Sequence, residues 1–189
     1  AAGIPGDVAG FAMAHKKYGT VPWRDLVAPS VRLAREGWAL DEFHASDLSR
    51  AASRMHKLGF HDSAKVFERA DGTAYEVGDV WRQPHLANTL ERIAEGGARA
   101  FYEGPLAKAL VTGVRGLGGI WTEADLSAYA AVERDPVEFE YHGHRVITMP
   151  PPSAGGVVLR QILAGSDHLD MASYGWQSAE MVHLYVETL

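Results

Sequence analysis

The sequence contains no cysteine, and this absence narrows the chemistry open to the chain. A disulfide scaffold and a thiolate metal site are both excluded. No apolar run approaches the roughly 18 residues typical of a membrane-spanning helix. Positive charge is in deficit, because 18 Lys and Arg stand against 24 Asp and Glu and give a formal net charge of −6. Nucleic-acid-binding proteins usually present a basic face, so this balance argues against that class.

Both ends of the sequence lack features of a complete chain. The chain does not begin with Met, and residues 1–6 have neither the basic start nor the apolar core of a signal peptide. Residues 177–189 keep a helical spacing of apolar positions up to the last residue, with no Gly or Pro stop. We therefore expect these residues to be an internal piece of a longer protein.

The residues that are present are typical of a folded domain. The 189 residues are 47% hydrophobic and 22% charged, ordinary values for a soluble globular protein. Apolar periodicity and helix-capping residues predict a helix-rich α/β (α+β) fold. Pro29 is expected to break or kink the second helix. The expected helices cover about 6–19, 20–37, 41–58, 84–96, 106–114, 122–129, 153–163 and 177–189.

One β-hairpin is predicted near residues 136–150. Apolar and acidic residues alternate over 137–141, the period of a half-buried strand. His142-Gly143 supplies a turn, and a second strand is expected over 145–149. The proline run 150–152 then ends the strand.

Ser153 is the first candidate for chemistry, because it stands where a strand is expected to turn into a helix. A nucleophile elbow needs Gly-x-Ser-x-Gly, but Pro151 stands where the first Gly should be. The pattern favours an N-cap serine, with Gly155 and Gly156 allowing close packing. A third interpretation is that the free N–H groups of this helix start face a bound anion or carboxylate.

Two further motifs have a functional and a structural interpretation. His142 and His144 are spaced i, i+2, so on a strand they would share a face that a metal can use. No third ligand has diagnostic spacing, and a polar hairpin turn is favoured. The glycine cluster of residues 113–119 lacks the Lys-Ser/Thr of a phosphate loop, so a surface loop is favoured.

The acidic and tryptophan residues show no pattern that indicates a site. Single carboxylates such as Asp79, Asp125 and Asp135 show no pairing, and a solvated or capping role is favoured. The tryptophans are expected in the core or at its rim rather than in a ligand box. They are Trp23, Trp38, Trp81, Trp121 and Trp176.

Short blocks run in a fixed order through nearly the whole chain. They are Ala2–Gly6 with Ala9-Gly10, His15–Trp23, Leu26–Gly37, Gly78-Asp79 with Leu86–Leu90 and Ile93–Gly97, Ala100–Gly104, Gly118-Gly119 with Thr122, Asp125-Leu126 and Tyr129, Tyr141–Gly143, and Met149–Gly156. In this order they resemble the gamma-glutamyltranspeptidase family, including its KYGTLPW and Pro-Pro-Pro-Ser-Ser-Gly-Gly stretches. Ala154 stands where the family usually has a second Ser, and residues 41–77 match poorly.

The resemblance implies a fold and an activity for the parent protein. Residues 1–189 would be a single partial domain of the large subunit, within the αββα sandwich of N-terminal-nucleophile hydrolases. The parent would transfer or hydrolyse the gamma-glutamyl group of glutathione-like amides. Its nucleophile would be the N-terminal Thr of a small subunit, with its own amino group as base. An arginine near the start of the large subunit would hold the substrate carboxylate.

None of these catalytic positions has a match in this chain. We therefore expect no catalytic residue, no metal and no cofactor here, and name only Ser153, Gly155 and Gly156 as substrate-adjacent candidates. The expected partners are the small subunit, the rest of the large subunit and a gamma-glutamyl small molecule, with no nucleic acid and no membrane span. The resemblance also implies a periplasmic or secreted parent. By itself the piece is expected to be inactive, and marginally stable or self-associating.

Three alternatives stay open at this stage. The first is an N-terminal-nucleophile acylase of the cephalosporin acylase type, which would share the scaffold and cut another amide. The second is a non-enzymatic helical interaction domain, and the third is a serine hydrolase that uses Ser153.

Overall fold

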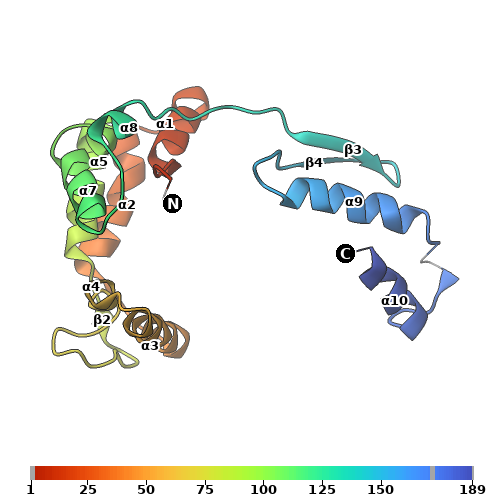
Figure 1. Ribbon diagram of the computed structural model, residues 1–189, viewed down its shortest axis with the longest axis horizontal. Coiled ribbons are helices and arrows are strands. Elements are labelled where there is room, and N and C mark those ends of the chain that lie inside the picture. Colours follow the sequence, from red (N-terminus) through yellow and green to blue (C-terminus); the bar gives the residue numbers. More distant parts are fainter. Residues whose placement is uncertain (1–2, 171–172, 189) are drawn as a thin grey trace. The chain divides into compact units, whose positions relative to one another are not determined.

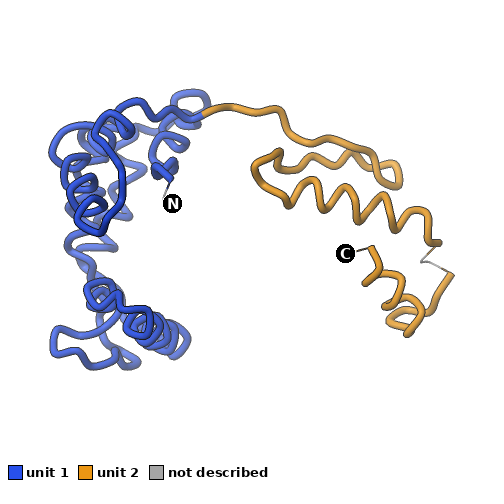
Figure 2. The backbone as a smooth tube through the Cα atoms, viewed as in Figure 1, with its two compact units in different colours: residues 1–131 blue, residues 132–189 orange. Residues whose placement is uncertain are grey.

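The computed structural model describes residues 3–170 and 173–188 (Figure 1). The chain divides into two compact units, Ala1–Ala131 and Val132–Leu189 (Figure 2). The prediction that residues 1–189 form one partial domain of a larger subunit stays a prediction.

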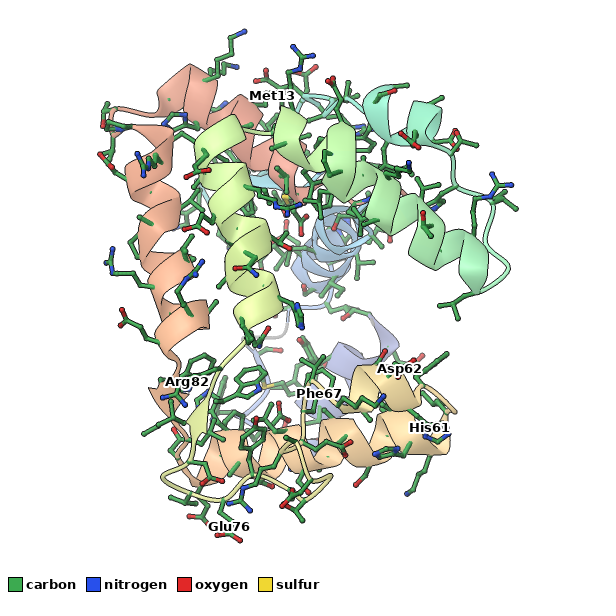
Figure 3. All side chains as sticks on the ribbon, turned by 90° about the vertical axis from the view of Figure 1, so that its left-hand side faces the viewer. Met13, His61, Asp62, Phe67, Glu76 and Arg82 are labelled. Atoms are coloured by element: carbon green, nitrogen blue, oxygen red, sulfur yellow. The ribbon has the colours of Figure 1, made fainter. Side chains whose placement is uncertain are left out.

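The first unit is built from helices and one very small sheet. The most extensive contact between its elements joins α2 and α5, which lie side by side (Figure 3). The indole N–H of Trp23 donates to the carbonyl oxygen of Ile93 at 2.9 Å and ties the two helices together. The elements are α1 (Asp7–Tyr18), α2 (Trp23–Glu36), β1 (Trp38–Ala39), α3 (Glu42–Lys57), α4 (His61–Ala64), β2 (Val80–Trp81), α5 (Pro84–Gly96), α6 (Arg99–Tyr102), α7 (Gly104–Gly116) and α8 (Glu123–Ser127).

A break or a kink was expected at Pro29, and the break is wrong, because α2 continues through Pro29 as one helix. Proline removes one backbone donor, which leaves the carbonyl of Asp25 without its helical partner. Pro29 and Asp25 are both exposed, so water can hydrate that carbonyl. The packing of α2 on α5 then outweighs the local preference of a single residue.

One core cluster of this unit surrounds α7 and α8. Tyr102, Ala107, Val111 and Leu126 are buried together, and Leu126 is fully inaccessible. The Tyr102 hydroxyl donates to the carbonyl oxygen of Pro5 at 2.7 Å and accepts from the amide of Ala9 at 3.1 Å. The turn before α1 is thereby fixed onto this core.

A second core cluster joins α3 to the small sheet. Leu40, Ala45 and Leu48 are buried, and the rings of Trp38 and Trp81 meet edge to face with centroids 5.0 Å apart. Trp38 and Trp81 are paired across the antiparallel β1–β2 ladder, which the sequence did not indicate. The short helix α4 was not predicted either, since four residues show no measurable periodicity.

The predicted hairpin is confirmed in the second unit. Strands β3 (Val137–Tyr141) and β4 (His144–Thr148) pair antiparallel, with Phe139 opposite Val146. His142 and Gly143 have φ values of 46° and 77°, as a two-residue hairpin turn requires. Helix α9 (Gly155–Asp167) packs against β3, and α10 (Ala179–Glu187) follows (Figure 1).

The helix-rich α+β class is confirmed. Within residues 3–170 and 173–188 the sheets are two-stranded, so the expected sandwich is not completed by these residues. Helix α10 agrees with the pattern predicted over 177–189, and Leu189 lies outside the described residues. None of the described helices is long and apolar enough to span a bilayer.

Candidate functional site

The strongest sequence candidate, the 149–156 segment, forms a tight connection between β4 and α9. The amide of Ser153 donates to the carbonyl of Pro150 at 3.2 Å and closes the turn. Gly156 is buried, and a side chain on it would overlap the carbonyl oxygen of Met149 and come within 2.9 Å of the Thr148 methyl. Gly156 is therefore required by packing, as the sequence predicted.

Ser153 does not cap α9, so that prediction is wrong. The N-cap is Ala154, whose backbone is already in the right-handed helical region, and no side chain accepts a hydrogen bond from the first N–H groups. Helix α9 begins at Gly155, so Ser153 lies before the N-cap residue and outside the helix. The first amides of α9 thus lack a side-chain cap.

Ser153 also lacks the neighbours of a serine nucleophile. A serine hydrolase holds a histidine within hydrogen-bond distance of the hydroxyl. Among the described residues no imidazole or carboxylate makes such a bond to Ser153 Oγ. A Cβ added to Gly155 would lie 3.6 Å from that hydroxyl oxygen. The geometry favours a turn residue over a nucleophile.

The two histidines of the hairpin have separate surroundings. His142 sits in the turn and pairs its Nε2 with Asp167 Oδ1 of α9 at 3.1 Å, with both side chains half exposed. His144 begins β4 opposite Tyr141. Strand alternation does not apply to a turn residue, so the spacing did not place both rings on one face. In the described part of the chain no group of three or more His, Cys, Asp or Glu side chains is arranged to hold a metal ion.

The glycine cluster 113–119 is the end of a helix. Gly113 and Gly116 belong to α7, so only residues 117–119 form the expected surface loop. Gly118 has a φ of 81°, and the amide of Gly119 donates to the Val114 carbonyl at 2.9 Å. This is a helix C-terminus closed by glycine, and it presents no phosphate cradle.

Two of the acidic candidates, Asp79 and Asp125, have structural partners, and Asp135 is exposed. Asp125 and Thr122 form a reciprocal capping box at the start of α8, and the hydrogen bonds from Thr122 lower the pKa of Asp125. The backbone N–H of Glu76, followed by the Arg69 guanidinium, lowers the pKa of Asp79. Capping was predicted for Asp125, whereas the Arg69–Asp79 pair was not.

The tryptophans divide between packing and solvent. Trp23, Trp38, Trp81 and Trp121 contact core residues or helix interfaces, as expected. The expected core or rim position is wrong for Trp176, which is 82% exposed.

The side chains of Glu68, His56 and His61 form a hydrogen-bonded chain that the sequence did not predict. Glu68 Oε2 lies 2.9 Å from His56 Nε2, and His56 Nδ1 lies 3.0 Å from His61 Nδ1 (His61 is labelled in Figure 3). The ring centroids are 5.3 Å apart, so the two nitrogens point almost directly at each other. That alignment is the geometry of a hydrogen bond between the two rings. No sequence signal identifies the trio, because its members lie on α3, α4 and a loop.

Comparison with known proteins gives one consistent result. The family model described as gamma-glutamyltranspeptidase matches residues 1–189. Glutathione hydrolase proenzyme from Escherichia coli (strain K12) is 40% identical over 187 residues, which is 99% of this chain and 32% of that protein. The chain therefore spans about a third of the length of the curated relatives it matches.

Solved structures show the same fold. The crystal structure of Helicobacter pylori gamma-glutamyltranspeptidase aligns with a TM-score of 0.91 at 36% identity, over 99% of this chain and 53% of that chain. Cephalosporin acylase from Bacillus halodurans aligns with a TM-score of 0.80 at 27% identity, over 96% of this chain and 34% of that chain. Both similarities confirm the predicted fold class.

Proposed function

The chain belongs to the gamma-glutamyltranspeptidase family, and we propose on this premise that it is a supporting part of the large subunit of such an enzyme. The match of the family model over all 189 residues carries the proposal. The parent would release the gamma-glutamyl group of glutathione-like amides to water or to an amine acceptor. Family membership favours this enzyme over a non-enzymatic helical interaction domain.

The catalytic groups would come from other parts of the parent polypeptide. By resemblance, an N-terminal Thr hydroxyl attacks the gamma-glutamyl carbonyl and its own amino group takes the proton. Backbone N–H groups stabilise the oxyanion, and an arginine pairs with the substrate carboxylate. The Escherichia coli relative is named a proenzyme, and this name supports a parent protein that is processed into subunits. The same resemblance supports export to the periplasm or the medium.

The activity can be tested on the full-length parent. We expect it to release p-nitroaniline from gamma-glutamyl-p-nitroanilide, faster when a dipeptide acceptor is added. Replacing the small-subunit Thr by Ala should abolish release, while purified residues 1–189 should show none. Activity of the purified 189-residue chain, with contaminating enzyme excluded, would contradict the assignment of these residues as scaffold.

An acylase of the cephalosporin type is the second candidate, supported by the similarity to the Bacillus halodurans structure. The same purified parent should be offered a glutaryl-cephalosporin amide. Cleavage of that amide without cleavage of the gamma-glutamyl amide would favour the acylase. We expect the opposite preference, because the 36% identity to the transpeptidase exceeds the 27% identity to the acylase.

The turn formed by Ser153, Gly155 and Gly156 is proposed to border the substrate in the parent. The uncapped start of α9 supports this, since free N–H groups at a helix start attract anions. Ser153→Ala in the parent should raise KM severalfold and leave kcat unchanged. Ser46→Ala, at an exposed position of α3, is the matched control. Equal KM values for both variants would place the turn away from the substrate.

A further inference from the structure

Three helices of the first unit line an apolar groove that has no role in the proposed function. The groove has a volume of about 590 Å³ and lies between α1, α2 and α5. Phe11 and Tyr18 contribute from α1, Trp23 and Leu26 from α2, and Leu90 from α5. This volume lies within the range of roughly 300–1,000 Å³ found for pockets that enclose an organic ligand or several side chains.

The lining is exposed to an unusual degree for large apolar side chains. Phe11 is 68% exposed, Tyr18 is 72% exposed and Leu26 is 49% exposed. Single exposed apolar residues are common, but a contiguous group of them marks a surface that another molecule or segment covers. Burying these side chains would also contribute free energy in proportion to the area removed from water.

Two polar side chains of the lining, Trp23 and His15, have hydrogen-bond partners within the unit. The Trp23 indole N–H donates to the Ile93 carbonyl, and His15 Nε2 lies 2.7 Å from the Val21 carbonyl oxygen. The His15 and Trp23 rings meet edge to face with centroids 5.4 Å apart. Most of the lining is apolar, so the groove suits apolar side chains.

The length of the relatives indicates what covers the groove. This chain accounts for 32% of the Escherichia coli relative and 53% of the Helicobacter pylori chain, with the fold retained at a TM-score of 0.91. We propose that a segment of the parent polypeptide from outside residues 1–189 lays an apolar face into the groove. This inference rests on the proposed function, in which residues 1–189 are part of a longer subunit.

Photo-crosslinking in the full-length parent tests the occupant. Phe11 is replaced by p-benzoylphenylalanine, the protein is irradiated, and the crosslinked peptides are identified by mass spectrometry. We expect one dominant partner peptide from outside residues 1–189. The same probe at Phe43, which is 67% exposed on α3 and outside the groove, must not give that peptide.

A crosslink from position 11 to any other partner would overturn the proposal. A crosslink between heavy-isotope and light copies would identify a second copy as the occupant. A crosslink to residues 132–188 would identify the second unit, and the absence of any crosslink would mean an open groove. If the Phe11 variant does not fold, Tyr18 carries the probe instead. Hydrolysis of gamma-glutamyl-p-nitroanilide, measured on the same samples, shows separately whether the proposed function holds.

Discussion

The carboxylate of Asp79 organises the loop that precedes β2. Its Oδ2 accepts hydrogen bonds from the backbone N–H of Glu76 at 2.7 Å and from Nε of Arg69 at 2.9 Å. Arg69 also lies 3.6 Å from a carboxylate oxygen of Glu76. One side chain therefore joins the two ends of a segment whose backbone is otherwise held by the isolated antiparallel bridge between Glu68 and Ala74.

The order of this loop should depend on pH. Because the folded pKa of Asp79 is lowered, its contribution is complete above the unfolded carboxyl pKa of about 3.9 and is lost as pH falls through the folded value. We expect amide exchange at Glu76 in the parent protein, corrected for intrinsic rates, to accelerate below about pH 4. Asp79→Asn should remove this dependence. A pH-dependence that persists in that variant would assign it to another group.

Leu126 should be the most sensitive apolar position of the first unit. It is fully buried against Tyr102 and Val111, so Leu126→Ala leaves a cavity that helices cannot easily close. We expect urea unfolding of the parent to show a loss of about 2–5 kcal/mol. Leu117→Ala is the matched control, since Leu117 is 91% exposed, and its effect should stay within about 0.5 kcal/mol. Similar losses for both variants would contradict this account of the core.

At the scale of elements, the contact between β4 and α9 depends on the absence of a side chain. Gly156 lies directly against the backbone of Met149, so the helix and the strand approach more closely than any Cβ allows. Ser153 lies just outside α9, whose N-cap residue is Ala154. The close approach at the start of the helix therefore requires glycine at position 156.

Gly156→Ala should force α9 away from β4. We expect a loss of about 1–3 kcal/mol in the stability of the parent, measured by thermal unfolding, as for other overpacked sites. Gly155→Ala is the control, because its added Cβ would meet only Ser153 Oγ, at 3.6 Å. That variant should be neutral or slightly stabilising, since Ala is the better helix former. Equal destabilisation by both variants would show that backbone freedom, rather than close contact, explains the glycine pair.

At the scale of the whole molecule, residues 1–189 expose apolar surface on each unit. The first unit has the groove between α1, α2 and α5, and in the second unit Val182, Tyr185 and Val186 of α10 are each about half exposed. The two-stranded hairpin also has outer strand edges with no further strand beside them among the described residues. Such surfaces favour association with other chains.

The isolated 189-residue chain should therefore self-associate or unfold readily. Size-exclusion chromatography with light scattering is expected to show species larger than the 20.5 kDa monomer. Replacing Phe11 and Leu26 by Ser should shift the distribution towards monomer, because it removes apolar area from the groove. A wild-type monomer that melts cooperatively would contradict this prediction.

The sequence by itself determined the features that depend on neighbouring residues. Asp41 accepts from the His44 amide at the start of α3, Pro84 opens α5, and Thr122 with Asp125 caps α8. The turn at His142-Gly143 follows equally from adjacent residues. These interactions span at most four residues, so local residue types are enough to predict them. The ordered family blocks likewise indicate the family from residue types alone.

Only the tertiary structure decided the features that join distant residues. The pairing of Trp38 with Trp81, the chain from Glu68 through His56 to His61, and the continuation of α2 through Pro29 all depend on contacts between separate elements. The apolar groove has the same origin, since it needs α1, α2 and α5 to meet. Residue types set the local preferences, but packing free energy summed over whole helices exceeds the preference of any single residue.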